Sequence, residues 1–188
     1  MKKYEFTGET KRVELWNRTA TLHRIKATVE FGFVKVGELG GWIEKEENLS
    51  HEGKAWVCGD AKVWGNAKVC GDAKVCGDAE VWGNAKVCGD AEVWGNAKVW
   101  GNAEVCGDAE VFLASHVLVM GSVGSRNDFT TFFRDKDNEI TVKCGCFLGK
   151  IDKFLEKVTQ THGNNKYALV YRAAVEVAKL QIELTERK

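Results

Sequence analysis

The stretch from Ala55 to Asp108 reads AWVCGD-AKVWGN-AKVCGD-AKVCGD-AEVWGN-AKVCGD-AEVWGN-AKVWGN-AEVCGD. It consists of nine consecutive copies of a six-residue unit, Ala-x-Val-[Trp/Cys]-Gly-[Asp/Asn]. A period this short is typical of solenoids, in which each unit is one strand and one turn that needs neighbours above and below to bury its apolar side chains. The repeat therefore predicts a stack of coils.

The order of Trp and Cys units predicts how many units form one coil, because residues stacked in a column share one environment. Units 18 residues apart match in five of six pairs, against three of seven at a spacing of 12 and none of five at 24. We therefore expect three units per coil, which gives a triangular prism of parallel strands. Duplication of an 18-residue segment would give the same count, and its coils would still have to stack.

The alternation within a unit predicts which side chains face inward. Successive side chains of a strand point to opposite sides, so Ala and Val line the interior and the residue between them faces outward. The Gly-Asp and Gly-Asn pairs suit the corners, because Gly adopts positive φ without a Cβ clash. Lys62, Glu80 and Lys98 then form an outward column of alternating charge.

Units such as Val63-Trp64-Gly65-Asn66-Ala67-Lys68-Val69 resemble the hexapeptide-repeat proteins of bacteria and their phages. The resemblance extends upstream to Glu38-Leu39-Gly40-Gly41-Trp42 and covers about two fifths of the chain. It implies a mainly β fold, a left-handed parallel β-helix with three hexads per coil. Many members of this group are acyltransferases that use a histidine in a cleft between the subunits of a trimer, so an acyltransferase activity is one alternative.

The flanking segments predict a cap at each end of the prism. We expect an N-terminal β cap and lead-in over residues 1–50, the β-helix over 51–123, and a ββαα domain over 124–188. In the cap, residues 13–16 and 22–27 show partial strand alternation. The array fades after Phe112, and residues 114–123 are expected to add part of an irregular coil. Exposed core and open strand edges at a solenoid end make such caps physically necessary.

The C-terminal segment predicts a β-hairpin followed by two helices. Residues 129–134 and 140–144 are β-rich and flank a turn-forming cluster at 135–139. Apolar residues at helical spacing predict a helix around 151–158 and a longer one from Asn165 to about Leu184, separated by Gly163 and Asn164. The expected apolar stripe of the longer helix includes Val170, Ala174, Val177 and Leu184. This segment resembles a tail domain appended to repeat proteins in phages and bacterial mobile elements.

Composition excludes several classes of function. Lys plus Arg and Asp plus Glu both number 27, so no global field favours nonspecific binding to nucleic acid or membranes. No apolar run reaches the length of a signal peptide core or a membrane span, which predicts a cytoplasmic protein, in the host cytoplasm if a phage encodes it. Seven cysteines, five of them in repeat positions, suggest free thiols.

The stacked columns offer candidate contact surfaces. Trp64, Trp82 and Trp100 would form an apolar ridge, covered either by the C-terminal helix or by another subunit, and we expect it to be the contact of a homo-oligomer, a dimer or trimer. The Cys70, Cys88 and Cys106 column spreads its thiols along a line, whereas zinc needs ligands that converge on one point, so we expect no metal site there. Cys144 and Cys146 with His162 do not complete a metal site either.

The sequence favours binding over catalysis. The nine repeats contain no histidine and no loop excursion, and His51 and His116, which flank the array, are more simply explained as capping residues than as a catalytic base. We expect no catalytic residues and no cofactor. A self-assembling structural scaffold is a further alternative.

A set of hydrogen-bond donors gathers near the C-terminal hairpin. Such donors suit a phosphate or a nucleotide-like anion. We therefore expect a non-catalytic binding protein of phage or mobile-element origin that captures a small nucleotide-like ligand or a host protein. The expected ligand-binding residues are Ser125, Arg126, Asn127, Thr130, Thr131, Arg134, Lys143, Tyr167 and Tyr171.

Overall fold

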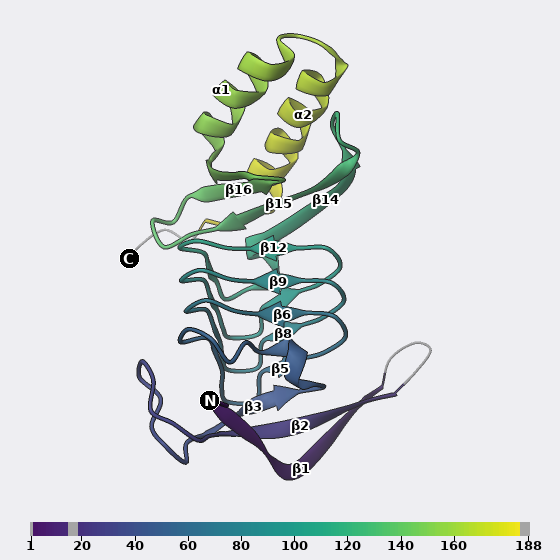
Figure 1. Cartoon of the computed structure of the whole chain (residues 1–188). Helices are drawn as coiled ribbons and strands as arrows, with labels where there is room; N and C mark the ends of the chain where they lie inside the picture. Colours follow the sequence, from purple (N-terminus) through teal and green to yellow (C-terminus); the bar gives the residue numbers. More distant parts are fainter. Residues whose placement is uncertain (1, 15–18, 185–188) are drawn as a thin grey trace.

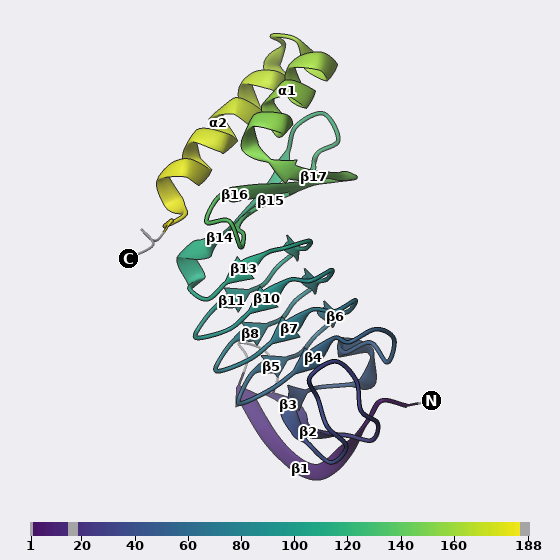
Figure 2. The same cartoon turned by 90° about the vertical axis from the view of Figure 1, so that its left-hand side faces the viewer.

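A parallel β-solenoid of about four turns stands between an N-terminal β-hairpin and a C-terminal antiparallel sheet that carries two helices (Figures 1 and 2). The computed structural model describes residues 2–14 and 19–184 of the 188-residue chain. Within these residues, no helix is both long enough and apolar enough to cross a membrane.

The solenoid strands are short and regularly spaced. Their bounds are β3 Leu39–Ile43, β4 Trp56–Val57, β5 Lys62–Val63, β6 Lys68–Val69, β7 Lys74–Val75, β8 Glu80–Val81, β9 Lys86–Val87, β10 Glu92–Val93, β11 Lys98–Val99, β12 Glu104–Val105 and β13 Glu110–Val111. They form three parallel faces, β3-β5-β8-β11, β4-β7-β10-β13 and β6-β9-β12. Paired solenoid strands from β4 onward lie 18 residues apart, as when Lys62 pairs with Glu80 and Lys74 with Glu92. Consecutive strands of the chain therefore belong to different faces.

The interior of the solenoid consists of alanine and valine, as the alternation predicts. Every Ala and Val of the array from Ala55 to Val111 is buried in one continuous core. The corners bring backbones of neighbouring coils very close together. At Gly89, where φ is +71°, an added Cβ would lie 2.8 Å from the backbone nitrogen of Gly107, so only glycine fits there.

Charged side chains pair along the outside. Lys62 Nζ lies 2.9 Å from Glu80 Oε1, and Lys98 Nζ lies 3.8 Å from the other oxygen of the same carboxylate. This confirms the alternating column predicted from the sequence. A second pair, Lys74 with Glu92, is 2.7 Å apart on another face. Such partly exposed pairs contribute little individually, about 0.2–1 kcal/mol each.

The N-terminal cap is a long hairpin joined to the first face. Strands β1 (Tyr4–Glu14) and β2 (Thr19–Ala27) pair antiparallel, and β2 pairs antiparallel with β3. The buried Lys3 ammonium donates to the backbone oxygen of Ala55 at 2.8 Å, and burial lowers its pKa to about 8, although nearby Asp72 opposes this shift. Of the strand expected at residues 13–16, Leu15 and Trp16 lie outside the described residues.

A hydroxyl and a short helix complete this cap. The Tyr4 hydroxyl donates to the backbone oxygen of Leu49 at 2.8 Å, directly after a 3₁₀ turn at Glu46–Asn48. The side chain of Asn48 donates to the backbone oxygen of Ala67 at 2.8 Å, one coil further on. The lead-in segment is thus tied to the first complete coil by buried hydrogen bonds, which are costly to break.

The C-terminal sheet has four antiparallel strands in the order β14 (Val117–Val123), β15 (Asp128–Arg134), β16 (Ile140–Cys144) and β17 (Phe147–Lys150). The expectation that residues 114–123 add an irregular coil is wrong. After a 3₁₀ turn at Ala114–His116, β14 pairs antiparallel with β15 and belongs to this sheet. The boundary expected at residue 124 falls in the turn between these two strands.

The sheet closes the end of the solenoid because its two faces pack on different cores. Phe133 is fully buried among the alanines and valines of the prism, together with the partly buried Val117 and Val119. The neighbouring Phe132 points the other way and packs under the helices with Val142. Successive side chains of β14 and β15 point to opposite faces of the sheet, so one face packs on the prism core and the other on the helical core.

Helices α1 (Ile151–His162) and α2 (Lys166–Gln181) lie on the outer face of this sheet (Figure 2). Gly163 ends α1, and Asn165 caps α2 by accepting from the backbone nitrogens of Tyr167 and Ala168. The apolar stripe predicted for α2 is wrong except at Ala174, since Val170, Val177 and Leu184 are 41%, 45% and 43% exposed. The buried face carries small residues instead, because they allow the helix to approach the sheet closely; these are Ala168, Ala174, Val175 and Ala178, with Tyr171.

Candidate functional site

A hollow of about 370 Å³ lies where one corner of the prism meets the C-terminal sheet. The prism contributes the corner asparagines and the start of β12, and the sheet contributes β15, β16 and the turn after β16. The Thr131 hydroxyl accepts a hydrogen bond from the backbone nitrogen of Glu104 at 3.0 Å, which holds β15 against β12. The lining residues are Asn84, Asn102, Glu104, Asp128, Phe129, Thr131, Lys143 and Gly145.

A ladder of asparagine amides runs up the corner to this hollow. Lys45 Nζ donates to Asn66 Oδ1 at 3.2 Å, and Asn66 Nδ2 donates to Asn84 Oδ1 at 3.2 Å. Asn84 Nδ2 in turn donates to Asn102 Oδ1 at 3.0 Å. The ladder exists because the Asn residues that follow Trp in the repeat recur 18 residues apart.

The charges around the hollow are balanced. Lys143 Nζ lies 3.2 Å from Glu104 Oε2 and also donates to the backbone oxygen of Gly145. The Arg126 guanidinium lies 3.9 Å from Asp128 Oδ2, close to Gly145. Each cation at the hollow thus has a carboxylate partner. A polyanion would gain little there, because it would compete with those carboxylates.

The structure places only part of the expected ligand set at the hollow. Thr131 and Lys143 line it, and Arg126 stands beside it. Asn127, with φ of 52°, and Ser125 lie in the turn between β14 and β15, and Ser125 hydrogen-bonds the hydroxyl of Tyr171. This turn is therefore anchored to the helices as well as to the sheet.

The other expected residues lie away from the hollow. Thr130 is buried on the helical side of β15, where its hydroxyl lies 3.2 Å from Cys144 Sγ. Tyr171 is buried beside the same thiol, and burial, with the nearby Cys144, raises the pKa of its hydroxyl. Tyr167 is on α2 beside His162, with ring centres 5.9 Å apart. These three residues belong to the helical core or its edge.

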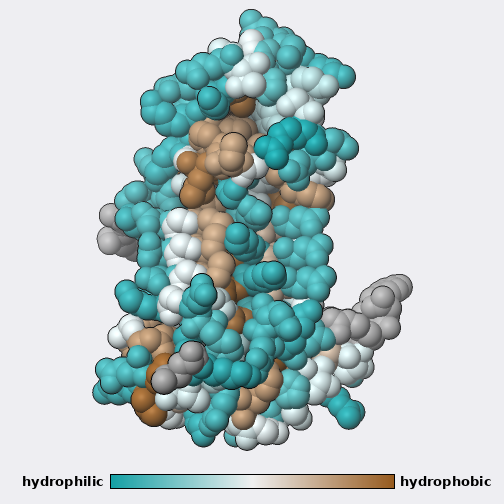
Figure 3. All heavy atoms as spheres, in the orientation of Figure 1, coloured by the Kyte–Doolittle hydropathy of each residue, from teal (hydrophilic) through white to brown (hydrophobic). Residues whose placement is uncertain are grey.

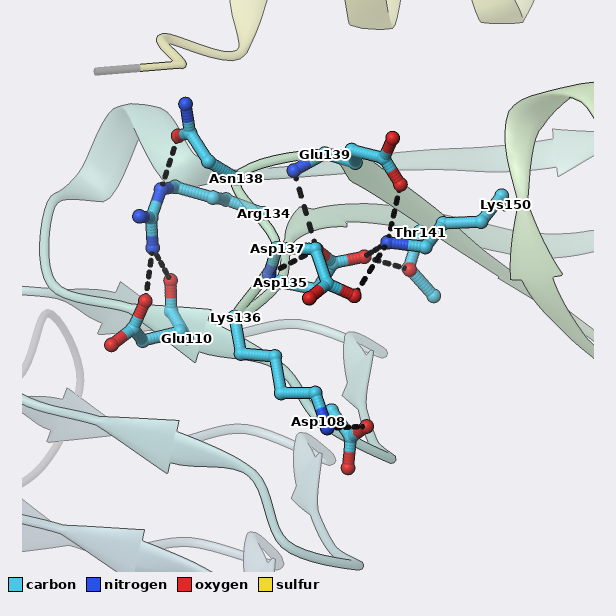
Figure 4. A network of polar contacts seen from close by, with 10 residues as sticks. All are labelled: Asp108, Glu110, Arg134, Asp135, Lys136, Asp137, Asn138, Glu139, Thr141 and Lys150. Atoms are coloured by element: carbon cyan, nitrogen blue, oxygen red, sulfur yellow. Dashed lines mark hydrogen bonds and ion pairs between the residues drawn. The ribbon is translucent and has the colours of Figure 1, made fainter. Parts of the chain in front are cut away.

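Arg134 belongs to a buried polar joint between the sheet and the last coil (Figure 4). Its Nη1 donates to Glu110 Oε2 at 2.7 Å, and its Nε donates to Asn138 at 2.9 Å. The guanidinium also lies over the Phe112 ring, 4.8 Å from its centre. With Nε and Nη1 both hydrogen-bonded inside the protein, Arg134 fixes the sheet on the prism.

Asp135 is the centre of the same joint. Its carboxylate, 4% exposed, accepts from Lys150 Nζ at 2.5 Å, from the Thr141 hydroxyl at 2.5 Å and from the backbone nitrogen of Asp137 at 3.0 Å (Figure 4). Burial alone would raise the pKa of Asp135, but these donors outweigh it and the pKa is lowered. Burial likewise opposes the charge of Lys150, yet its carboxylate partners raise its pKa to about 12. Both groups therefore stay charged around neutral pH.

The tryptophan column stacks as a ridge but is covered unevenly. Successive ring centres of Trp64, Trp82 and Trp100 are 5.1 and 5.4 Å apart, with nearly parallel planes. The N-terminal hairpin, through Ala20 and Leu22, buries Trp64, whereas Trp100 is 49% exposed. The residues that cover Trp64 thus belong to the N-terminal cap and not to the C-terminal helices.

The expectation of free thiols is wrong for four cysteines. Cys58 forms a disulfide with Cys76, and Cys88 forms one with Cys106, with Cα atoms 4.6 and 4.7 Å apart. Stacking at the strand spacing brings residues of neighbouring coils into the range that a disulfide spans. Cys70, Cys144 and Cys146 are free thiols. Across the described residues, no group of three or more His, Cys, Asp or Glu side chains could hold a metal ion.

The two histidines that flank the array lie at opposite ends of the prism. His51 stacks on Tyr4 in the N-terminal cap, with ring centres 4.3 Å apart, and burial lowers its pKa. His116 is fully buried beside Phe112, and burial, together with the charge of Arg134, lowers its pKa. The two side chains therefore do not share a site within one chain.

Sequence reasoning missed the prism side of the hollow. Asn84, Asn102 and Glu104 belong to repeat units that look alike throughout the array, so nothing in one unit marks it as part of a site. For the asparagines, the 18-residue spacing of Asn84 and Asn102 was the available signal, because it predicts an amide column that ends where the repeat ends. Comparison with models of protein families and with curated protein sequences finds no match for this chain.

Proposed function

We propose that the protein is a non-catalytic binding protein that holds a small nucleotide-like ligand in the hollow between the prism and the C-terminal sheet. The observation that carries this proposal is the combination of a partly exposed aromatic ring, Phe129, with amide, hydroxyl and charged groups around a hollow of about 370 Å³. Rings stack on aromatic faces, and a few convergent polar groups fix their orientation.

The origin and the details of the solenoid are part of the same proposal. We propose a left-handed prism of three six-residue units per coil, encoded by a phage or mobile element and acting in the cytoplasm. The 18-residue spacing of the paired strands from β4 onward and the resemblance of the repeat units support it. A host protein bound to the same face is the alternative to a small ligand.

Isothermal titration with nucleosides and nucleotides tests ligand binding directly. We expect binding in the micromolar to millimolar range, weakened about fivefold or more by Phe129→Ala, because stacking on an aromatic ring contributes about 1–3 kcal/mol per base. Asn96→Ala is the matched control, since Asn96 occupies an equivalent corner on another edge of the prism. Absence of binding to every nucleoside and nucleotide would contradict the proposal.

We further propose that the protein is a homo-oligomer, a dimer or trimer, that associates through the exposed part of the tryptophan ridge. The exposure of Trp100, and the partial exposure of Trp82, favour this over a contact at the buried Trp64. Light scattering should show an oligomer for the native chain and a monomer for Trp100→Ser. The same mass for both proteins would rule this contact out.

A further inference from the structure

The asparagine ladder has a direction that Lys45 imposes. An ammonium group only donates hydrogen bonds, so Asn66 must turn its oxygen toward Lys45. Asn66 then has only its NH₂ group to offer to Asn84, which must accept with its oxygen and donate onward to Asn102. The orientation of all three amides is therefore linked to one cation at the far end of the column.

Asn102 ends this ladder as a donor at the hollow. Its oxygen accepts from Asn84, and within the described part of the chain its NH₂ group donates no hydrogen bond. The residue 18 positions further on is Met120, which lies in β14, so no fourth asparagine continues the column. The hollow beside Asn84 and Asn102 thus receives an unused amide donor.

An unused acceptor lies two residues along the chain. Glu104 Oε2 pairs with Lys143, which leaves Oε1 available. Asp128, the other carboxylate of the hollow, is already occupied, because Oδ1 accepts from the backbone nitrogen of Phe129 at 2.8 Å and Oδ2 faces Arg126. Asn102 and Glu104, which both line the hollow, therefore offer it one donor and one acceptor from the prism.

We propose that the hollow recognises a neutral heterocycle by a lactam edge, a ring carbonyl next to a ring N–H. The carbonyl accepts from Asn102 Nδ2, the N–H donates to Glu104 Oε1, and the ring lies on Phe129. Inosine, guanosine and uridine carry this edge. This assignment rests on the proposed function and narrows its ligand class.

In the same ring orientation, the reversed edge does not match these two groups. Adenosine and cytidine present an amino group and a bare ring nitrogen, which would place two donors together at Asn102 and two lone pairs together at Glu104. Polar groups left unpaired in this way weaken the binding of the wrong ligand. Since the charges of the hollow are already balanced, a phosphate on the ligand should change affinity little.

Isothermal titration with two matched pairs of nucleosides tests the proposal. Inosine differs from adenosine, and uridine from cytidine, mainly in this edge. We expect inosine and uridine to bind at least about tenfold more tightly than their partners, a difference of about 1.4 kcal/mol. Asn102→Ala should weaken inosine binding and remove the discrimination, whereas Asn96→Ala should leave both unchanged.

A variant at Lys45, at the far end of the ladder from the hollow, tests whether the ladder sets the orientation of Asn102. In Lys45→Glu the carboxylate only accepts hydrogen bonds, so Asn66 must donate to it and the whole ladder reverses, which turns the oxygen of Asn102 toward the hollow. The inosine-to-adenosine affinity ratio should then fall to one or below, although Lys45 does not touch the ligand. Melting temperatures of each variant check that the fold is intact.

The outcomes separate this inference from the proposed function. If all four nucleosides bind equally and Asn102→Ala changes nothing, the hollow binds nucleosides but the lactam assignment is wrong. If inosine is preferred in the native protein and equally in Lys45→Glu, the edge is recognised but the ladder does not set its direction. If none of the four binds, both the ligand class and the proposed function are wrong.

Discussion

Asp135 is a nearly buried carboxylate whose hydrogen-bond donors all lie in the C-terminal sheet and in the turn between β15 and β16. A buried charge is stabilising only while its partners remain, because the cost of removing it from water is large. The joint therefore depends on Lys150 and Thr141 as much as on Asp135. The exposed ion pairs nearby do not depend on their partners in this way, because water solvates each of their charges.

We predict that Asp135→Asn lowers the free energy of unfolding by about 2–4 kcal/mol, because Lys150 loses its main partner and the amide cannot accept from every donor. The matched control is Lys136→Met. It removes the exposed pair with Asp108, which is screened by water, and should leave the midpoint of unfolding almost unchanged. Urea denaturation of the three proteins measures the difference, and equal midpoints for all of them would refute the prediction.

His116 should make the stability of the protein depend on pH. Burial holds its pKa below the ordinary value of 6.5, so the unfolded chain binds a proton more readily than the folded one. Stability is therefore full above about pH 6.5 and falls as the pH drops from there toward the lowered pKa of the folded state. His51 shifts in the same direction and adds to the effect.

We predict that His116→Gln loses less stability than the native protein between pH 7 and pH 5, because glutamine does not take up a proton there. Thermal melting at several pH values measures this. His23→Gln, in the N-terminal hairpin, is a suitable control because the side chain of His23 is not fully buried. Parallel stability profiles for native protein and His116→Gln would show that His116 does not titrate on unfolding.

Among the structural elements, the face β6-β9-β12 carries three cysteines in one column. Cys70 donates its backbone N–H to Val87, and Cys88 donates to Val105, both at 3.0 Å, so Cys70 lies below Cys88 just as Cys88 lies below Cys106. Figure 3 shows an apolar band running along the prism in the view of Figure 1, where these strands face the reader. Cys88 thus has a potential partner on each side.

We predict that oxidised Cys106→Ser forms a Cys70–Cys88 disulfide without loss of the fold, since the two positions have the same stacking geometry. Peptide mapping under non-reducing conditions detects the new bond. The tryptic peptides 75–86 and 87–98 have identical sequences, so the experiment needs a background of Cys58→Ser and Cys76→Ser. A Cys88 that stays a free thiol after oxidation would show that the column is not regular.

The periodic elements were more predictable from sequence than the caps. The Ala and Val interior follows from strand alternation, which is local. The pairing of β14 with β15 was missed because the irregular run from Ala114 to Val123 resembles a failing repeat, and its partner lies beyond a turn. The buried face of α2 was missed because its alanines carry a weaker hydrophobic signal than the exposed Val170, Val177 and Leu180.

The candidate site was predicted only where donors cluster in sequence. Thr131 and Lys143 lie on neighbouring strands of one hairpin, so their proximity follows from the strand pairing. Asn102 and Glu104 come from the prism, and their approach to β15 depends on how the sheet docks on the last coil. No local pattern encodes that docking, because it results from the burial of Phe133 in the prism core together with the pairing of Arg134 with Glu110.

The whole molecule is stabilised by contacts between neighbouring parts, since each coil packs on the next coil and each cap packs on one end of the solenoid. A disturbance at one end should therefore remain near that end, as in other repeat proteins. Phe133 is the fully buried side chain through which the C-terminal sheet packs on the prism core, beside the partly buried Val117 and Val119. Phe132, beside it, serves the helical core instead.

We predict that Phe133→Ala lowers stability by about 3–5 kcal/mol, the usual cost of removing a buried phenylalanine. Hydrogen exchange should speed up in β12, β13 and the C-terminal sheet and stay unchanged in β1, β2 and β3. Phe132→Ala is the matched control, and its effect should be largest in the helices. Faster exchange along the entire solenoid in Phe133→Ala would show that the molecule unfolds as one unit instead.

Because the stacked strands from β4 onward are 18 residues apart, the length of the solenoid is set by the number of its repeat units. Gaining or losing 18 residues would move the hollow relative to the N-terminal hairpin by one strand spacing, about 4.8 Å, without rotating it. Gaining or losing six would instead turn it to another side of the prism. The distance of the hollow from the N-terminal hairpin and the side of the prism on which it lies can thus be changed independently. Each change needs only the insertion or deletion of whole repeat units, with both caps kept intact.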